Sequence, residues 1–302
     1  MKRTNVTLVI LLAVLLLTSA PAGAAPLVVE HPLGTVSLDR TPERVVVFDY
    51  GVLDALDVLG VEVVGVPASN LPPFLSKFSG PDYVNVGTLF EPDFEAIYAL
   101  NPDLIIISTR QASQYEELSR IGPTLYVEID NATWWGSVQS NLQLLGELFD
   151  LRTEVEGILA GLNERVSRIC EQASESGLRT LIVMANDGAL SVYGAESRFG
   201  IVHQDFGFAA ADDAIDSATH GQNISFEYLV KVNPDVIFVV DRASVAGGSI
   251  GAEQVMSNPL VKVTKASQTN RVIYLQSQAW YVVSGGIRST EMMMDDVEQL
   301  FR

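Results

Sequence analysis

The chain has 302 residues, of which 48% are hydrophobic and 19% are charged, a composition typical of a globular protein long enough for two lobes. Acidic residues outnumber basic residues by 37 to 19, which gives a net charge of −18. So negative a surface argues against nucleic acid and anionic membranes as partners. An anionic ligand would need positive charge gathered in one place.

The first 24 residues have the pattern of an export signal. Lys2 and Arg3 precede the apolar run Leu8–Leu17, which is short for a transmembrane helix, and small residues at 22–24 are typical of a cleavage site. No cysteine lies near this site, so we expect an exported chain without an N-terminal lipid anchor. The single cysteine, Cys170, cannot form an intramolecular disulfide.

Beyond the signal, apolar runs of strand length alternate with helical segments. His31–Leu38 and Arg44–Asp49 predict a hairpin that leads into a buried strand, and Val52–Leu59 predicts a short helix. Further strands are expected at 61–66, 104–107, 125–129, 180–185, 236–240 and 272–275, with a closing helix at 289–301. Such a pattern predicts mainly parallel sheets that are covered on both faces.

Residues 152–175 form one long amphipathic pattern, with apolar residues at steps of three and four. A helix of this length spans roughly 36 Å. It contains no proline and two glycines, Gly157 and Gly161. We interpret residues 150–176 as a stiff connector between an N-terminal lobe, 25–149, and a C-terminal lobe, 177–302. The alternative is an ordinary surface helix of one lobe.

Two segments, Phe94–Arg110 and Phe226–Arg242, are nearly the same. Each contains a short helix, an Asn-Pro-Asp turn, a buried strand and a final arginine. A glutamate, Glu95 or Glu227, lies six residues before each Asn-Pro-Asp. This repeat is too long for a solenoid and instead predicts two similar α/β lobes with a cleft between them.

Arg110 and Arg242 each lie just beyond the carboxyl end of a predicted buried strand, where ligands bind in open α/β sheets. The guanidinium group always carries charge and offers a planar set of donors to oxyanions. Arg198, in a glycine-flanked loop after another strand, is a third candidate beside these two. Any one of them alone could be an ordinary solvated loop residue.

Two further side chains could bind a metal. His220 lies in a polar loop before the second repeat, and neutral imidazole is a common metal ligand, although an exposed loop histidine is equally plausible. Tyr281 lies in an aromatic and β-branched run before Gly285-Gly286, which predicts a strand end opening into a loop. Core packing is one role for it, and donation of a phenolate to Fe³⁺ is the other.

The acids Glu95 and Glu227 occupy matching positions on the two predicted lobes. They could be solvated charges, or they could dock onto basic residues of a pseudo-symmetric partner. Residues 247–251 match the Gly-x-Ser-x-Gly pattern of hydrolases, but no histidine follows Ser249. We find no nucleophile with a positioned base and therefore predict no catalytic residue and no enzyme.

Together these features resemble the periplasmic substrate-binding proteins of ABC importers, in the iron-siderophore, haem and cobalamin class. The resemblance covers nearly all of the mature chain and is carried by residues 31–36 and 42–47, both Asn-Pro-Asp segments and the middle helix. It implies a class III fold, in which two Rossmann-like α/β lobes are joined by one long rigid helix. Segments 109–112, 197–200, 219–221, 240–242 and 280–285 resemble binders of ferric catecholate siderophores of the enterobactin, petrobactin and anguibactin types.

The resemblance also implies roles for individual residues. Arg110, Arg198 and Arg242 would contact the negative catecholates. His220 and Tyr281 would complete the iron coordination when the siderophore supplies four donor atoms.

In the wider class, glutamates that match Glu95 and Glu227 dock onto arginines of the permease. The expected protein is therefore a monomeric periplasmic carrier with a ferric siderophore as its ligand and no cofactor of its own. A haem or cobalamin carrier is the alternative, and an exported enzyme is a remote one. A carrier of bare metal ions is disfavoured, because the three histidines, at 31, 203 and 220, are scattered.

Overall fold

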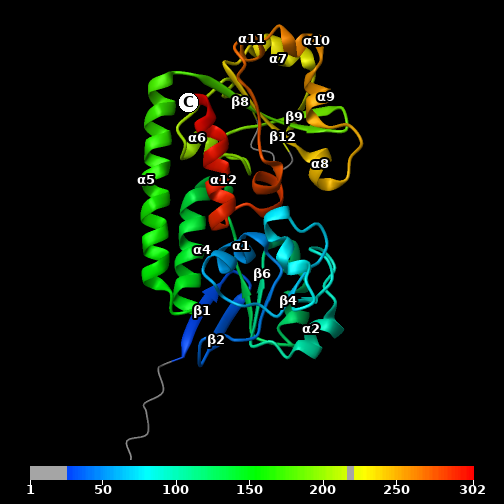
Figure 1. Ribbon diagram of the computed structural model, residues 1–302, viewed down its shortest axis with the longest axis vertical. Coiled ribbons are helices and arrows are strands. Elements are labelled where there is room, and N and C mark those ends of the chain that lie inside the picture. The colour runs from blue at the N-terminus through cyan, green and yellow to red at the C-terminus, as the bar shows by residue number, and fades with distance from the viewer. Residues whose placement is uncertain (1–25, 216–220) are drawn as a thin grey trace, which may run out of the picture.

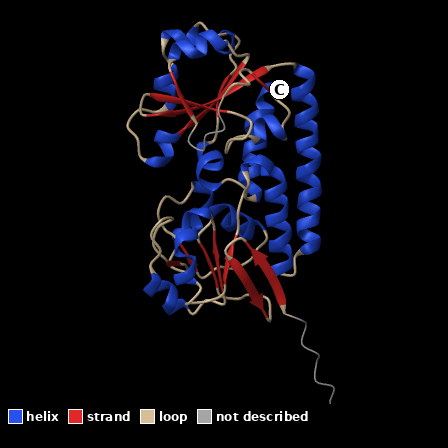
Figure 2. Ribbon diagram, turned by 180° about the vertical axis from the view of Figure 1, so that it is seen from behind, coloured by secondary structure: helices blue, strands red, loops and turns tan. Residues whose placement is uncertain are grey.

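The computed structural model describes residues 26–215 and 221–302 (Figure 1). The predicted signal at 1–24 and His220 lie outside these residues. Two α/β lobes lie one above the other, and α5 (Arg152–Ser176) runs along the same edge of both lobes in the front and back views (Figure 2).

The first lobe contains a hairpin and a five-stranded sheet, which confirms the predicted hairpin and the buried strand that follows it. The hairpin pairs β1 (Leu27–His31) with β2 (Gly34–Leu38). The sheet has the order β5-β4-β3-β6-β7, and every pair in it is parallel. Its strands are β3 (Val45–Val47), β4 (Gly65–Val66), β5 (Val84–Asn85), β6 (Leu104–Ile107) and β7 (Thr124–Tyr126). Both β3 and β6 are entirely buried, as expected for strands covered on both faces.

Helices surround this sheet. They are α1 (Tyr50–Val58), η1 (Pro73–Ser79), α2 (Phe94–Leu100), η2 (Thr109–Gln114), α3 (Tyr115–Leu118), η3 (Asn131–Thr133) and α4 (Trp134–Leu148). The predicted strands at 61–66 and 125–129 are shorter than expected, because only the parts that pair with a neighbour form a ladder.

The second lobe has a mixed sheet in the order β11-β9-β8-β12-β13, with β10 also paired to β8. Its strands are β8 (Arg179–Asn186), β9 (Ala189–Tyr193), β10 (Ala209–Ala210), β11 (Gln222–Ile224), β12 (Val236–Asp241) and β13 (Val272–Tyr274). Strand β9 was not predicted from the sequence. Its signal was the pair Asp187-Gly188, which has positive φ at both residues and joins β8 to β9 as a two-residue hairpin turn.

The helical segments of the second lobe are short, except for α12. They are α6 (Ile201–Gln204), α7 (Phe226–Val232), α8 (Arg242–Ala246), α9 (Ala252–Met256), α10 (Pro259–Lys262), α11 (Lys265–Gln268), the π-helical turn η4 (Gln278–Val283), α12 (Ile287–Glu298) and η5 (Gln299–Phe301). The final helix therefore begins two residues earlier than the pattern predicted and ends in a 3₁₀ turn.

The Asn-Pro-Asp repeat has the same structure in both lobes. Asn101 ends α2 and Asn233 ends α7, each in the left-handed region with φ of 45° and 46°. The aspartate of the first turn accepts the backbone N–H of Arg44 at 2.7 Å, and that of the second accepts the N–H of Arg179 at 3.0 Å. Each turn thus ends a helix and also fixes the start of the neighbouring central strand.

The long helix α5 ends at Gly177, which adopts a left-handed conformation with φ of 61°. Its apolar face packs against α4 and α12. The buried residues on that face are Val155, Leu159, Leu162, Val166, Ile169 and Ala173. They belong to one apolar cluster that also contains Leu53 of the first lobe and Trp280 of the second, so the connector and both lobes share a core.

A buried carboxylate joins α1 of the first lobe to the start of α12. Asp54 on α1 is 0% exposed and accepts the backbone N–H of Ser289 at 2.8 Å. Arg288 donates to Asp54 at 3.3 Å and to Asp57 at 3.1 Å. Burial raises the pKa of Asp54 to about 6, although the donors Ser289 and Arg288 favour the charged form.

We predict that Asp54 makes stability fall as the pH rises from 4 to 7. The native carboxyl keeps its proton to about pH 6, whereas the ordinary pKa of an aspartate is 3.8, so folding takes up a proton between these values. The unfolding free energy of the wild type, minus that of Asp54→Asn, should fall by about 2–3 kcal/mol over this range. Urea titrations at several pH values measure this difference. A difference that does not change with pH would contradict the prediction.

Candidate functional site

A cavity of about 590 Å³ lies between the two lobes. One wall is formed where strands of the first sheet end, with Asp49 after β3, Ser108–Arg110 after β6 and Val127–Ile129 after β7. Trp134 and other residues of α4 close one side, and Arg198 and segment 281–285 of the second lobe supply the opposite wall. The site therefore occupies the carboxyl edge of a parallel sheet, where α/β folds bind ligands.

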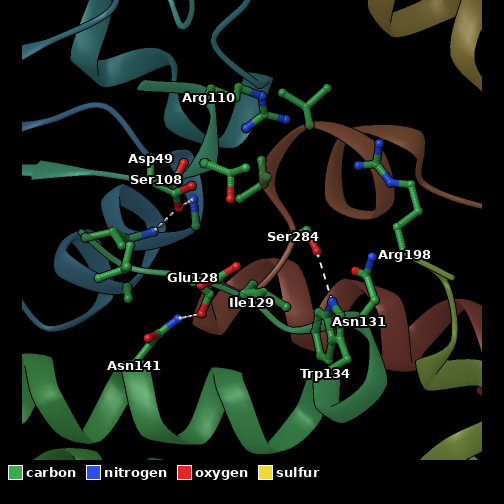
Figure 3. A pocket seen from close by; sticks show the side chains of 18 of the residues that line it. Asp49, Ser108, Arg110, Glu128, Ile129, Asn131, Trp134, Asn141, Arg198 and Ser284 are labelled. Atoms are coloured by element: carbon green, nitrogen blue, oxygen red, sulfur yellow. Dashed lines mark hydrogen bonds between the residues drawn. The ribbon is translucent and has the colours of Figure 1, made fainter. Parts of the chain in front are cut away.

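Arg110 reaches the cavity from η2 of the first lobe, and Arg198 reaches it from the loop after β9 of the second lobe (Figure 3). The charge of Arg110 lies close enough to Tyr50 to oppose the rise in the pKa of that phenol, which burial causes. Burial also lowers the pKa of Arg198, and the like charge of Arg110 acts in the same direction. The two arginines therefore face a common space from different lobes.

Arg198 is held by aromatic and backbone groups instead of a carboxylate. Its Nη2 donates to the backbone oxygen of Tyr281 at 2.8 Å, and its guanidinium lies 4.3 Å from the centre of the Tyr281 ring. The ring of Phe199 is 5.3 Å away. The buried Nε of Arg198 has no hydrogen-bond partner among the described residues. This cation is desolvated and only partly satisfied, which favours an incoming anion.

Arg242 begins α8 and does not line the cavity itself. Its Nε donates to the hydroxyl of Tyr281 at 2.9 Å, and its Nη1 donates to Asn186 Oδ1 at 3.0 Å. Tyr281 therefore lies between Arg198 on its ring face and Arg242 at its hydroxyl.

The predicted local structure at Tyr281 was wrong, because it lies in the π-helical turn η4 and not at the end of a strand. The backbone N–H of Ser284 bonds to the oxygen of Ala279, five residues earlier, at 3.0 Å. Trp280 is buried and donates to Asp296 at 2.9 Å, while Tyr281 lines the cavity. Trp280 in this turn is bonded to Asp296 of α12, 16 residues later, and no local pattern could reveal that contact.

Several lining residues were not predicted from the sequence. Asp49 has one oxygen that accepts the N–H groups of Gly51 and Val52 at the start of α1, a position that follows a buried strand and could have been found on that ground. Trp134 donates its indole N–H to Ser284 across the lobes at 3.3 Å. The exposed Glu128 lies at the rim, so the cavity carries negative groups as well as positive ones.

The arginines at the site differ from those elsewhere in their partners. Within 26–215 and 221–302, no ion pair joins Arg110, Arg198 or Arg242 to a carboxylate. By contrast, Arg165 on α5 bonds to Glu298 at 2.8 Å, and Arg288 pairs with two aspartates. These three cations therefore have no ion pair in the described part of a chain whose net charge is −18.

The other predicted residues lie elsewhere. Glu95 on α2 and Glu227 on α7 are exposed, and Figure 1 places these helices in opposite lobes, both away from α5. His220 is outside the described residues. In the part of the chain that is described, no three His, Cys, Asp or Glu side chains are grouped to hold a metal ion.

The sequence profile of the family described as periplasmic binding protein matches residues 45–279. The chain belongs to this family. It is 42% identical over 275 residues to the petrobactin-binding protein YclQ of Bacillus subtilis, covering 89% of this chain and 86% of that protein. It is 36% identical to the ferric-anguibactin-binding protein FatB of Vibrio anguillarum, covering 90% and 86% of the two chains.

Solved structures agree with the sequence relatives. The crystal structure of YclQ superposes with a TM-score of 0.88 at 41% identity, covering 91% of this chain and 98% of that one. The periplasmic catecholate-siderophore binding protein VctP of Vibrio cholerae gives a TM-score of 0.86 at 36% identity, covering 91% and 99%. The predicted class III binding-protein fold and the siderophore-binder resemblance are confirmed.

Membership of the family also indicates the class of protein and its location. The family and these relatives are substrate-binding proteins, and the family implies a location outside the cytoplasm. None of the helices within 26–215 and 221–302 has the length and apolar character needed to cross a bilayer.

We predict that Gly285→Ala destabilises the protein by about 1–3 kcal/mol. Gly285 has φ of +90°, and an added Cβ would collide with Ile129, which lines the cavity. Urea denaturation at fixed pH measures the change. The matched control is Gly161→Ala in α5, where a Cβ meets nothing within 4 Å and should stabilise by up to about 1 kcal/mol. If the Gly285 variant is as stable as the wild type or more stable, the expected strain and collision at Gly285 are contradicted.

Proposed function

We propose that this protein captures a ferric catecholate siderophore in the cavity between its lobes and delivers it to an ABC importer of the inner membrane. The observation that carries this proposal is the set of arginines at the site that have no carboxylate partner in the described chain. The relatives named for petrobactin and anguibactin, and VctP, named for catecholate siderophores, support the choice of ligand. The periplasm is the proposed location, with residues 1–24 as a cleaved signal.

The chemistry of the ligand fits the charges of the site. A ferric bis-catecholate is an anion with oxygen acceptors, and Arg110 and Arg198 can donate to those oxygens from the two lobes. Charge-assisted hydrogen bonds of this kind contribute about 1.5–3 kcal/mol each. Arg242 acts indirectly, because it donates a hydrogen bond to the hydroxyl of Tyr281 and so holds that side chain in place.

Iron would arrive as part of the ligand. Tyr281 lines the cavity and would supply one oxygen to ferric iron when the siderophore leaves coordination positions open. His220 is proposed as the second protein donor on the strength of the sequence resemblance. In this proposal the protein has no resident cofactor, performs no catalysis and functions as a monomer.

The proposed division of the chain assigns 25–149 to the first lobe, 150–176 to the connector and 177–302 to the second lobe. The proposal is supported by α5, which is continuous from Arg152 to Ser176, and by the core it shares with both lobes. Such a frame would hold the cavity walls nearly in place before the ligand arrives.

Delivery requires contact with the permease, and we assign it to Glu95 and Glu227. Each is exposed in the first turn of α2 or α7, and each of these helices ends at a left-handed asparagine. A hydrogen bond from Ser225 lowers the pKa of Glu227, which favours its charged form. One acid on each lobe would pair with an arginine of the importer.

We predict that Arg110→Gln weakens binding of a ferric bis-catecholate by about ten- to a hundredfold. Quenching of tryptophan fluorescence measures this, because Trp134 lines the cavity. The matched control, Arg120→Gln, removes an exposed arginine that does not line the cavity and should leave affinity unchanged. The double variant His220→Ala with Tyr281→Phe should alter the visible absorption of the bound complex.

Other ligands test the siderophore assignment against the haem and cobalamin alternatives. A ferric tris-catecholate, a ferric hydroxamate, haemin and cobalamin are titrated in the same buffer. Binding of haemin or cobalamin alone would overturn the siderophore assignment, and an unchanged spectrum in the double variant would overturn direct coordination of iron.

We predict that Glu95→Arg combined with Glu227→Arg abolishes uptake of the ferric siderophore in cells and leaves its affinity in solution unchanged. Reversal of both charges turns attraction to the permease into repulsion. Uptake of ⁵⁵Fe-labelled complex is measured beside fluorescence titration of the purified variant. Full uptake by the double variant would show that these acids are not the docking residues.

A further inference from the structure

An aromatic ring lies at the rim of the cavity without protein packing to account for it. Phe90 is 65% exposed and lines the same cavity as Arg110 and Tyr281. A single exposed apolar side chain is ordinary on a protein surface. Phe90 differs from such a residue, because its ring lines the cavity and its backbone is held in a turn.

The backbone around Phe90 forms a tight turn. The hydroxyl of Thr88 accepts the N–H groups of Phe90 at 3.1 Å and of Glu91 at 2.9 Å, and the backbone N–H of Thr88 bonds to the oxygen of Glu91 at 3.0 Å. Gly87, with φ of 104°, forms a bridge with Pro92 at the base of the turn. The position from which the ring projects is therefore determined before any ligand binds.

Two glutamines connect this turn to the segment that carries Arg110. Gln111 is 0% exposed; its Nε2 donates to the oxygen of Leu89, and its Oε1 accepts the N–H of Ser108 at 3.1 Å. Gln114, on the same 3₁₀ helix as Arg110, donates to the oxygen of Phe90 at 3.4 Å. Phe90 and Arg110 therefore belong to one hydrogen-bonded unit on the wall of the first lobe.

We infer that Phe90 selects ligands with aromatic rings, by packing on a catechol ring whose oxygens are bound by Arg110. This inference rests on the proposed function and deepens it. In the free protein the ring contacts water, so covering it with another ring removes apolar surface from water and adds the attraction of an aromatic pair. An anionic iron chelate built only from aliphatic carboxylates receives the charge interaction and not the ring interaction, and a ferric hydroxamate, whose iron centre is neutral, receives neither.

The test compares ferric bis-catecholate with ferric citrate and a ferric hydroxamate, which have no aromatic ring. Phe90→Ala should weaken binding of the bis-catecholate about tenfold and change the affinity for the aliphatic complexes by less than twofold. Phe90→Leu keeps an apolar side chain without a ring and should still weaken the catecholate. The matched control is Tyr98→Ala on α2, which removes another aromatic ring, 73% exposed, that does not line the cavity.

The outcomes separate this inference from the proposed function. If the wild type binds no ferric catecholate, the proposed function fails. If it binds one and Phe90→Ala is unchanged, only this inference is overturned. An equal loss for catecholate and aliphatic complexes, or wild-type catecholate affinity in Phe90→Leu, overturns selection by the ring. Unchanged affinity with reduced cellular uptake would instead assign Phe90 to the surface that meets the permease.

Discussion

The contact between α1 and the segment that leads into α12 is the constraint on which the site depends. Asp54 is fully buried and accepts the backbone N–H of Ser289 at 2.8 Å, so the two lobes meet through a fixed polar contact. Gly51 leaves room for the carbonyl oxygens of Val283 and Ser284, which would lie 2.9 and 2.6 Å from a Cβ at that position. Any larger residue there would push the second lobe away. Because η4 ends at Val283, this close approach also determines where Tyr281 stands in the cavity.

Such a junction is useful to a carrier only if it resists being opened. Separating α12 from α1 would break the hydrogen bonds that Asp54 accepts from Ser289 and Arg288 and would return the apolar surface of the junction to water, which is unfavourable. The shared apolar core around α5 acts in the same direction, since it contains residues of both lobes. The walls of the cavity are therefore largely in place before binding, and little ordering free energy is lost when a ligand arrives.

The distribution of positive charge follows the same division between frame and site. Arg165 and Arg288 are bound to carboxylates and hold elements of the frame together. Arg198 and Arg242 instead contact an aromatic ring, a phenol, an amide and a backbone carbonyl, which hold them without neutralising them. A protein with 37 acidic residues thus keeps Arg110 and Arg198 at the cavity without a carboxylate ion pair among the described residues, beside the acids Asp49 and Glu128. Its exposed acids on α2 and α7 lie outside the residues that line the cavity.

Local and repeated patterns in the sequence were enough to predict the two α/β lobes, the long helix and the candidate arginines. Buried strands, amphipathic spacing and the Asn-Pro-Asp turn each act over a few residues and occur twice, so the repeat marked matching positions such as Arg110 and Arg242. Tertiary contacts decided the rest. The turn that carries Tyr281 is bonded to α12 through Trp280 and Asp296. The turn that carries Phe90 is bonded to the segment of Arg110 through Gln111, which lies 22 residues away from the carbonyl it binds. These choices come from contacts between distant segments, and such contacts exist only once the chain has folded.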